Sequence, residues 1–233
     1  MIAEPAFLWD LDGTLVDSEP VHRLALTDAL AGLGVAAPAE LHASLLGRSP
    51  LELYAYCAAE LGITVSAAEL GARKLAAYER HAALLRPRAE AMELFDRLRA
   101  LGAAQGIVSN SDRVIVDVNL RALGLIIPDL VTVSRNDVRR GKPDPEPFLR
   151  AAHLLDTEPA RCVVVEDSPV GAAGGLAAGM RVVCFPEPRS GAPLEFPADA
   201  ELAHDGRELA ALLGLDTPDR RPQLARDCPE PEA

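Results

Sequence analysis

Residues 6–19 read Ala-Phe-Leu-Trp-Asp-Leu-Asp-Gly-Thr-Leu-Val-Asp-Ser-Glu, so that four apolar residues lead directly into two aspartates, Asp10 and Asp12. The run Ala6–Trp9 is short and bulky, which predicts a buried β-strand. An aspartate after a strand is commonly a turn or cap residue, and Asp10 taken alone fits that ordinary role. The function of the two aspartates therefore depends on which residues the rest of the chain brings to the end of this strand.

Four further apolar runs predict strands that alternate with helices. The helix-like stretches between them stop at Leu-Gly pairs, as expected when glycine takes the left-handed position after a helix. The runs are Gln105–Ser109, Leu130–Val133, Cys162–Val165 and Arg181–Phe185, and the stops are Gly102, Gly124 and Gly214. Short apolar strands joined by helices favour parallel pairing with right-handed crossovers. The expected fold class is α/β, with a doubly wound parallel sheet of the Rossmann-like kind.

The first interval of this pattern is too long for a single crossover. About seventy residues separate the first strand from the helix before the second, against roughly 30 for a whole βαβ unit. Residues Pro20–Leu85 read as helices throughout, with stops at Gly34 and Gly62. We expect an inserted helical cap, with hinges near Val16–Glu19 and Leu85–Arg88.

This interpretation divides the chain into three parts. Residues 1–17 and 87–215 are expected to form the α/β core domain, and residues 18–86 the small helical cap domain. The cap holds all three tyrosines, which we expect to pack its own centre; they are Tyr54, Tyr56 and Tyr78. Residues 216–233 are rich in proline and charge and lack periodicity, which predicts a disordered tail.

The overall composition narrows the class of partner and the location. The 233 residues carry a formal net charge of −12, so nucleic acid and anionic membrane surfaces would be repelled. The four cysteines form no CxxC pair, which favours a reducing compartment. The chain has no basic and apolar leader and no 18-residue apolar segment, so we expect a soluble, cytoplasmic protein. We expect it to be a monomer or a weak homodimer.

Polar side chains gather where the predicted strands end. In open α/β sheets the ligand site lies outside the carboxyl ends of the strands, which are all at one edge. The residues at or near those ends are Asp10 and Asp12, Ser109-Asn110-Ser111, Lys142 in a Gly-Lys-Pro-Asp-Pro loop, and Glu166-Asp167-Ser168. Each group alone has an ordinary role as a turn, a cap or a solvated lysine. Adjacent carboxylates after the buried run Val163–Val165 are harder to explain without a partner.

Together these groups suit phosphoryl transfer. Carboxylates at Asp10, Asp12, Glu166 and Asp167 can hold Mg²⁺, which prefers oxygen ligands. The bound metal would keep Asp10 ionised, so that its free oxygen attacks phosphorus as a nucleophile. Asp12 can then protonate the leaving alkoxide and later deprotonate the attacking water. The remaining phosphoryl oxygens would bind to three further residues, Ser109, Asn110 and Lys142.

The four segments, taken together, resemble the haloacid dehalogenase superfamily, in the subgroup of β-phosphoglucomutase-like enzymes and sugar-phosphate phosphatases. The resemblance runs from Phe7 to about Phe185. It rests on Asp10-Leu-Asp-Gly-Thr-Leu-Val-Asp-Ser-Glu19, Val108-Ser-Asn-Ser111, Gly141-Lys-Pro-Asp-Pro145 and Val165-Glu-Asp-Ser-Pro-Val-Gly171. The resemblance also implies a lid that closes over the site. The chain departs from the usual Pro-Gly at the return from the lid, where it has Pro87-Arg88-Ala89.

The resemblance assigns roles to individual residues. It implies that Asp10 is the nucleophile, Asp12 the acid and base, Ser109 a phosphate ligand and Lys142 a neutralising charge. Mg²⁺ would be held by Asp10, the Asp12 carbonyl and Asp167, while Glu166 would act either directly or through its neighbours. Dehalogenation is disfavoured, because a dehalogenase has no alkoxide for Asp12 to protonate.

Substrate choice is expected to come from the cap. The candidates are Glu19, His22, Arg48 and Lys74, of which Arg48 lies in a Gly-Arg-Ser loop resembling the substrate loop of relatives. His22 and Lys74 lie where the mutases carry a histidine and a lysine. Exposed polar positions on amphipathic helices are an equally good explanation for both.

Three functions fit these observations. The first is a Mg²⁺-dependent phosphatase of a small phosphorylated metabolite, such as a sugar, polyol or sugar-acid phosphate, acting through an aspartyl phosphate. The second is a β-phosphoglucomutase-like phosphomutase. The third is a non-catalytic phosphate-binding protein, which is the least favoured because Asp10, Asp12 and Lys142 are all present.

Overall fold

The computed structural model describes residues 5–38, 41, 50–187 and 194–215. A six-stranded parallel sheet forms its centre, in the order β5-β4-β1-β6-β7-β8. The strands are β1 (Ala6–Trp9), β4 (Gln105–Val108), β5 (Val131–Val133), β6 (Cys162–Glu166), β7 (Arg181–Cys184) and β8 (Glu201–Leu202). The predicted α/β class is confirmed, and the five predicted strands lie within one residue of their observed bounds.

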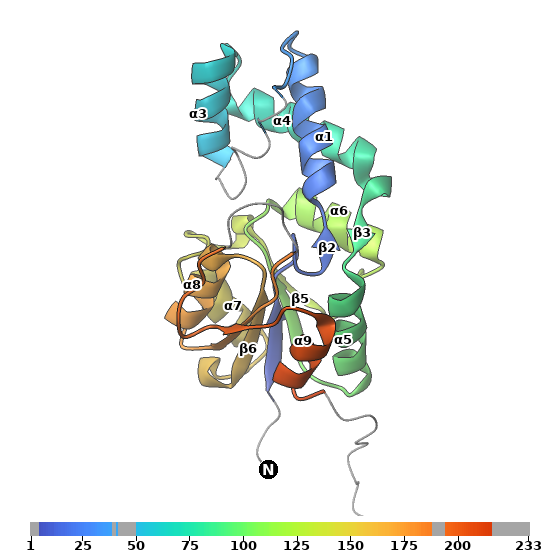
Figure 1. Ribbon diagram of the computed structural model, residues 1–233, viewed down its shortest axis with the longest axis vertical. Coiled ribbons are helices and arrows are strands. Elements are labelled where there is room, and N and C mark those ends of the chain that lie inside the picture. The colour runs from blue at the N-terminus through green and yellow to red at the C-terminus, as the bar shows by residue number, and fades with distance from the viewer. Residues whose placement is uncertain (1–4, 39–40, 42–49, 188–193, 216–233) are drawn as a thin grey trace, which may run out of the picture.

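Helices cover both faces of the sheet (Figure 1). On one side lie α5 (Ala89–Ala100) and α9 (Gly206–Leu212), and on the other α7 (Glu146–Leu154) and α8 (Pro169–Ala177). The remaining elements of this part are α6 (Arg113–Leu123) and the 3₁₀ turns η2 (Arg135–Asp137) and η3 (Pro159–Arg161). The α6 helix ends at Gly124, whose φ of 70° suits glycine, as the sequence predicts.

Side chains alternate across β1 and so supply two apolar clusters. Phe7 and Trp9 belong to the cluster that includes Phe95 of α5, while Leu8 belongs to the cluster that includes Phe148 of α7. A strand buried on both faces must be apolar throughout, which is why β1 reads as a continuous hydrophobic run. The apolar sheet therefore fixes the strand ends from which polar side chains can project.

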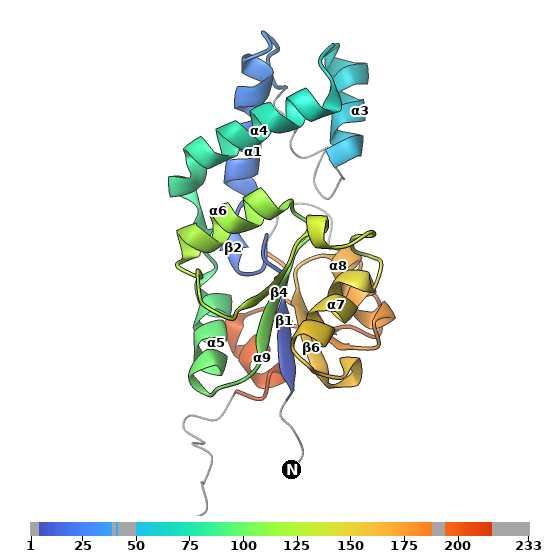
Figure 2. The same ribbon diagram turned by 180° about the vertical axis from the view of Figure 1, so that it is seen from behind.

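Among the described residues, three helices lie beyond the carboxyl ends of the strands, within the predicted cap: α1 (Glu19–Ala31), α3 (Pro50–Leu61) and α4 (Ala67–His81). They share a separate apolar cluster of buried residues, including Leu26, Cys57 and Leu70. Figure 2 shows α4 running across α1 and continuing toward α6. The short turn η1 (Ala82–Leu84) then leads the chain back to the sheet part.

The prediction for the tyrosines is correct for two of the three. Tyr54 and Tyr56 are partly buried against the apolar cluster of the cap. Tyr78 is fully buried, but in the cluster that contains Trp9. The prediction is wrong for Tyr78 because α4 outruns the other cap helices and reaches α6, where the tyrosine hydroxyl donates to Asn119.

The chain enters and leaves the cap at one place. Residues Val16–Asp17 (β2) pair antiparallel with Arg86–Pro87 (β3). The neighbouring Arg88 donates from Nη1 to the carbonyls of Gly13 (2.6 Å) and Phe185 (2.8 Å), and its guanidinium lies 4.2 Å from the centre of the Phe185 ring. The division into two domains stays a prediction, and β2 and β3 lie at its proposed boundaries.

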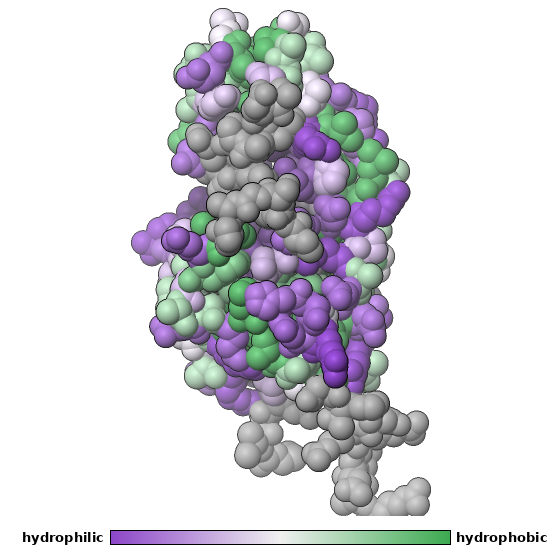
Figure 3. All heavy atoms as spheres, in the orientation of Figure 1, coloured by the Kyte–Doolittle hydropathy of each residue, from purple (hydrophilic) through white to green (hydrophobic). Residues whose placement is uncertain are grey.

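The surface is mixed in character. Figure 3 shows hydrophilic and hydrophobic residues interspersed on one face, over the cap helices and over the sheet part. Within the described ranges no helix is long and apolar enough to cross a bilayer. Cys57, Cys162 and Cys184 are buried free thiols. The predicted tail, residues 216–233, lies outside the described residues.

Candidate active site

The strand ends bring the predicted acidic residues together. The strands of the sheet are parallel, so their carboxyl ends share one edge, and the cap helices lie beyond that edge (Figure 1). Because β1 lies between β4 and β6, Asp10 after β1 is flanked by Ser109 after β4 and by Glu166 at the end of β6. Asp10, Ser109 and Glu166 are all buried. Buried carboxylates require compensating charge or hydrogen bonds.

Lys142 supplies much of that compensation. Its ammonium lies 2.7 Å from Asp10 Oδ1 and 2.5 Å from Glu166 Oε1, and it donates to the Val108 carbonyl at 2.7 Å. Burial would lower the pKa of Lys142, but Asp10 and Glu166 outweigh it and hold the pKa above its ordinary value. Lys142 therefore stays positive at the centre of the site.

Both carboxylate oxygens of Glu166 accept hydrogen bonds from other groups of the protein. Oε1 accepts from Lys142, and Oε2 accepts from the N–H groups of Asp167 and Ser168, each at 3.1 Å, and from the Ser168 hydroxyl at 2.9 Å. Gly171 makes room for this carboxylate, because a Cβ there would lie 1.7 Å from Oε1. Because its carboxylate is held in this way, Glu166 fixes the orientation of the Lys142 ammonium.

The cluster of Asp10, Glu166 and Asp167 has the chemistry of a cation site. One carboxylate oxygen of each lies within 4.8 Å of the others. Asp10 Oδ2 is buried without a hydrogen-bond partner. Burial and the charge of Glu166 raise the pKa of Asp10 well above its ordinary value, despite Lys142. An unpartnered oxygen beside surplus negative charge suits a hard divalent cation.

Asp12 has different surroundings from Asp10. Its Oδ1 accepts from Ser18 Oγ and from Asn119 Nδ2, each at 2.8 Å. Its Oδ2 accepts from Ser111 Oγ at 2.8 Å and from Ser109 Oγ at 3.3 Å. The side chain of Asp12 is therefore committed to protein donors, and any metal contact from this residue would come from its carbonyl.

The donors around Asp12 control its ionisation. Burial would raise its pKa, but His22, whose Nε2 lies 3.6 Å from Oδ1, and the hydroxyls of Ser111 and Ser18 outweigh burial. The pKa of Asp12 is consequently well below its ordinary value, whereas that of Asp10 is raised. The pKa values of two aspartates that are two residues apart are thus shifted in opposite directions.

The predicted phosphate ligands are placed at the same edge but differ in detail. Ser109 Oγ faces Asp12 and accepts the Ser111 N–H at 2.9 Å. The Asn110 amide binds the backbone of Lys142 instead, through Oδ1 to its N–H (2.8 Å) and Nδ2 to its carbonyl (3.0 Å). The side chain of Asn110 therefore positions the lysine loop, which the sequence did not indicate.

The cap candidates are brought to the site in part. Glu19 begins α1, and His22 faces Asp12 from the same helix. Half-buried Lys74 of α4 has its pKa lowered by burial, an effect opposed by Glu19, Asp12 and Asp112. Arg48 lies outside the described residues.

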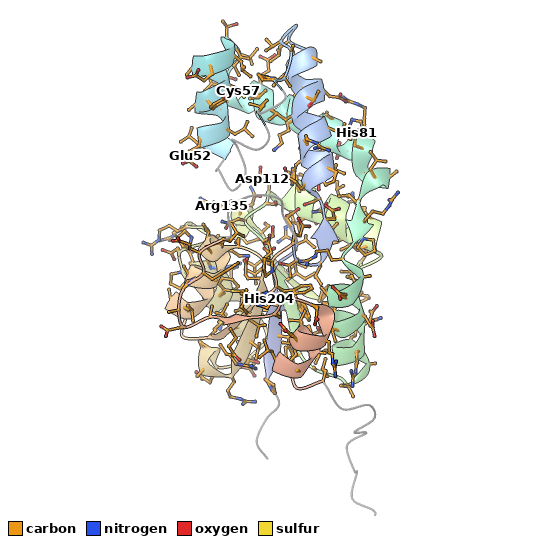
Figure 4. The ribbon with its side chains drawn as sticks, viewed as in Figure 1. Glu52, Cys57, His81, Asp112, Arg135 and His204 are labelled. Carbon is orange, nitrogen blue, oxygen red and sulfur yellow. The ribbon has the colours of Figure 1, made fainter. Side chains whose placement is uncertain are left out.

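Polar residues also border the space between the cap and the sheet part. Figure 4 shows Asp112 and Arg135 at the edge of the sheet part nearest the cap. Glu52 lies at the end of α3 nearest that edge. Charged groups therefore come from both sides of this junction.

The sequence did not predict the roles of several residues at the site. Asn119, Ser18 and Tyr78 surround Asp12 or its partners, and Arg88 binds the loop after Asp10. A polar residue inside the apolar face of a helix is the one signal that could have singled out Asn119. The departure from Pro-Gly marked Arg88 without revealing its contacts.

Known proteins resemble this chain over most of its length. A family model for haloacid dehalogenase-like hydrolases matches residues 5–179. Hexitol phosphatase A of Escherichia coli is 34% identical over 183 residues, covering 78% of this chain and 83% of the relative. Validoxylamine A 7'-phosphate phosphatase of Streptomyces hygroscopicus subsp. limoneus is 35% identical over 179 residues, covering 74% and 81%.

Solved structures agree with the fold and the family. CbbY from Rhodobacter sphaeroides, determined in complex with phosphate, has a TM-score of 0.80 at 26% identity, covering 92% of this chain and all of that chain (100%). The residues that match the family model, 5–179, include strands β1, β4, β5 and β6. They therefore include all four segments that meet at the site. The chain belongs to the haloacid dehalogenase-like hydrolases.

Proposed function

We propose that this hydrolase is a Mg²⁺-dependent phosphatase of a small sugar, polyol or sugar-acid phosphate, with Asp10 as its nucleophile. One observation carries the proposal. The buried Lys142 joins Asp10 to Glu166 beside Asp167, while a second aspartate, Asp12, lies within the same loop. Such a set can bind a phosphoryl group, attack it and protonate its leaving group.

The first half-reaction uses Asp10 and Asp12. A carboxylate oxygen of Asp10 attacks phosphorus while the bond to the ester oxygen breaks. Asp12, ionised in the free protein, must take up a proton as the phosphate ester binds, and it then gives that proton to the ester oxygen. The Lys142 ammonium and the Ser109 hydroxyl stabilise the charge on the phosphoryl oxygens. Asn110 contributes its backbone N–H, because its side-chain amide is bound to the lysine loop.

The second half-reaction releases phosphate. Asp12, now ionised, takes a proton from water as the water oxygen attacks phosphorus, and the bond to Asp10 breaks. Mg²⁺ would be held by Asp10, Asp167 and the Asp12 carbonyl, and when bound it supplies positive charge that offsets the carboxylates and clamps a phosphate oxygen. Glu166 orients Lys142 and does not need to bind the cation directly.

The proposed substrate class follows the relatives. These include a hexitol phosphatase and a fructose-1-phosphate phosphatase, both from Escherichia coli. Glu19, Lys74 and Arg48 are the cap residues we propose for substrate recognition. We further propose that the protein acts in the cytoplasm as a monomer or a weak homodimer.

Phosphate release from a panel of several dozen phosphorylated metabolites, with Mg²⁺ and with EDTA, tests the function. We expect Mg²⁺-dependent turnover, and a loss of at least about a thousandfold in Asp10→Asn, because a nucleophile has no substitute in the site. Asp96→Asn is the matched control, since Asp96 is an exposed partner of Arg99. Full activity of Asp10→Asn would rule out the mechanism.

A phosphomutase is the second candidate, favoured by the position of His22 beside Asp12. It requires the aspartyl phosphate to last until a sugar hydroxyl attacks it. Incubation with β-glucose 1-phosphate and a trace of the 1,6-bisphosphate separates the two functions. A mutase forms glucose 6-phosphate without matching phosphate release, whereas the proposed phosphatase releases phosphate.

A further inference from the structure

Asn119 is a polar residue in an apolar place. It lies within α6 with 0% exposure, and its helix neighbours Val116 and Leu120 belong to the large apolar cluster around Trp9. A buried side-chain amide is unfavourable unless its donors and acceptor find partners. The partners of Asn119 should therefore reveal why an amide occupies this position.

Both ends of the amide have partners on either side of the cap junction. Nδ2 donates to Asp12 Oδ1 at 2.8 Å, across 107 residues of sequence. Oδ1 accepts from the Tyr78 hydroxyl of α4 at 2.7 Å. The cap is thus joined to the proposed acid and base through one side chain of the sheet part.

Tyr78 fixes the orientation of the amide. Its ring is fully buried, and burial together with the charge of Asp12 raises its pKa above the ordinary value, so its hydroxyl keeps its proton and donates. Reversing the Asn119 amide would turn its carbonyl oxygen toward the Asp12 carboxylate, so that two acceptors would face each other, and the Tyr78 hydroxyl would lose its acceptor. The amide nitrogen therefore stays directed at Asp12.

We propose that Asn119, held by Tyr78, is a positioning residue that determines which oxygen of Asp12 carries the transferred proton. An amide N–H can only donate, so Oδ1 of Asp12 is restricted to accepting. Oδ2 instead meets the hydroxyls of Ser109 and Ser111, which can either donate or accept. The proton that Asp12 gives and takes is accordingly on Oδ2.

The inference rests on the proposed phosphatase mechanism. As Asp10 bonds to phosphorus and the ester bond breaks, the proton leaves Asp12 Oδ2 for the ester oxygen, and in hydrolysis a water proton returns to Oδ2. If the Asp12 carboxylate were misoriented, ester cleavage would slow only for substrates whose leaving group needs protonation. An alkoxide needs it, and p-nitrophenolate needs it far less because it is a stable anion.

Leaving-group dependence provides the test. We compare kcat and KM for a hexitol phosphate and for p-nitrophenyl phosphate in the wild type, Asn119→Leu and Tyr78→Phe. Leucine has nearly the shape of asparagine without its amide. For Asn119→Leu we expect kcat on the hexitol phosphate to fall about a hundredfold, within the range of general-acid effects, with less than a threefold fall on p-nitrophenyl phosphate. Tyr78→Phe should change kcat on the two substrates in the same pattern but by smaller factors.

Two controls complete the design. Tyr54→Phe removes a hydroxyl whose partner, the Val65 carbonyl, lies within the cap, and it should leave both substrates unaffected. Asp12→Asn removes the acid itself and reports on the parent mechanism. If the single Asn119→Leu variant does not fold, the double variant Tyr78→Phe with Asn119→Leu is measured in its place, because it removes both members of the buried hydrogen bond together.

The outcomes separate the inference from the function. Equal losses on both substrates, or no loss, in the Asn119 and Tyr78 variants would overturn the inference if Asp12→Asn still discriminates between leaving groups. Failure of Asp12→Asn to discriminate would overturn the proposed acid and the inference with it. A selective loss on the hexitol phosphate with KM unchanged supports the role of Asn119.

Discussion

Gly171 and Glu166 show how one missing Cβ can preserve a buried ion-pair cluster. A methyl group at Gly171 would lie 1.7 Å from Glu166 Oε1, the oxygen that accepts from Lys142. The carboxylate cannot move away without giving up the N–H groups that bind its other oxygen. The glycine is therefore required by the ion-pair cluster and not by its backbone conformation.

Gly171→Ala should accordingly lose both activity and stability. We expect activity to fall at least tenfold and the unfolding free energy to fall by about 2–4 kcal/mol, as for other changes that break a buried charge network. Gly71→Ala is the control, because nothing lies within 4 Å of its Cβ position inside α4. Helix propensity predicts that this control is stabilised by about 0.5–1 kcal/mol. Urea denaturation measures both, and equal effects would contradict the steric argument.

Among the elements, the short turn η2 depends on a capping box. Asp137 accepts from the Ser134 N–H at 2.7 Å and hydroxyl at 2.6 Å, and it pairs with Arg113 of α6. Burial opposes ionisation, but the Ser134 bonds and Arg113 lower the pKa of Asp137 below 3.8. The turn thus connects the loop after β5 to the helix after β4.

Asp137→Asn should lower the free energy of unfolding at neutral pH by about 1.5–3 kcal/mol, the usual effect of losing hydrogen bonds to a charged group. A lowered folded-state pKa contributes stability that is present above the ordinary pKa and is lost as pH falls through the folded value. The difference from wild type should therefore shrink below about pH 3.8. Thermal unfolding at pH 7 and pH 3 measures it. A difference independent of pH would contradict the assignment.

At the scale of the whole molecule, the negative charge gathered at one edge predicts that a cation stabilises the fold. Saturation with Mg²⁺ at about 100 times its Kd adds about 2.7 kcal/mol, which raises Tm by about 5–10 °C in a protein of this size. EDTA should reverse the shift, and Asp10→Asn should reduce it. A Tm that stays unchanged while Mg²⁺ is raised in tenfold steps would contradict a metal at this site.

Arg88 links the return from the cap to the loop after Asp10 and to the end of β7. Arg88→Gly leaves the carbonyls of Gly13 and Phe185 without this donor and removes the stacking over Phe185. We expect a loss of about 1.5–3 kcal/mol in unfolding free energy. Arg88→Lys should recover less than half, because an ammonium lacks the planar fork. Guanidinium denaturation measures the series, and a glycine variant as stable as wild type would refute the role.

Much of this arrangement could be predicted because it depends on local patterns. Apolar runs located five of the six strands of the parallel sheet within one residue, whereas the two-residue strand β8 was not predicted. Parallel pairing then placed Asp10, Lys142 and Glu166 at one edge. The contacts of Asn119 and Tyr78 could not be predicted, since they depend on where α4 crosses α6. The use of the Asn110 amide was equally hidden, because it depends on the path of the lysine loop.

The pairing of Val16–Asp17 with Arg86–Pro87 has a consequence for how such a protein can change. All six strands of the parallel sheet lie outside the segment between these two pairs, so the sheet is topologically complete without it. Under the proposed function, a different helical segment grafted between the same two points would meet new substrates while the strand order and the phosphate chemistry persist. Selectivity and reactivity would then be separately exchangeable parts of one chain.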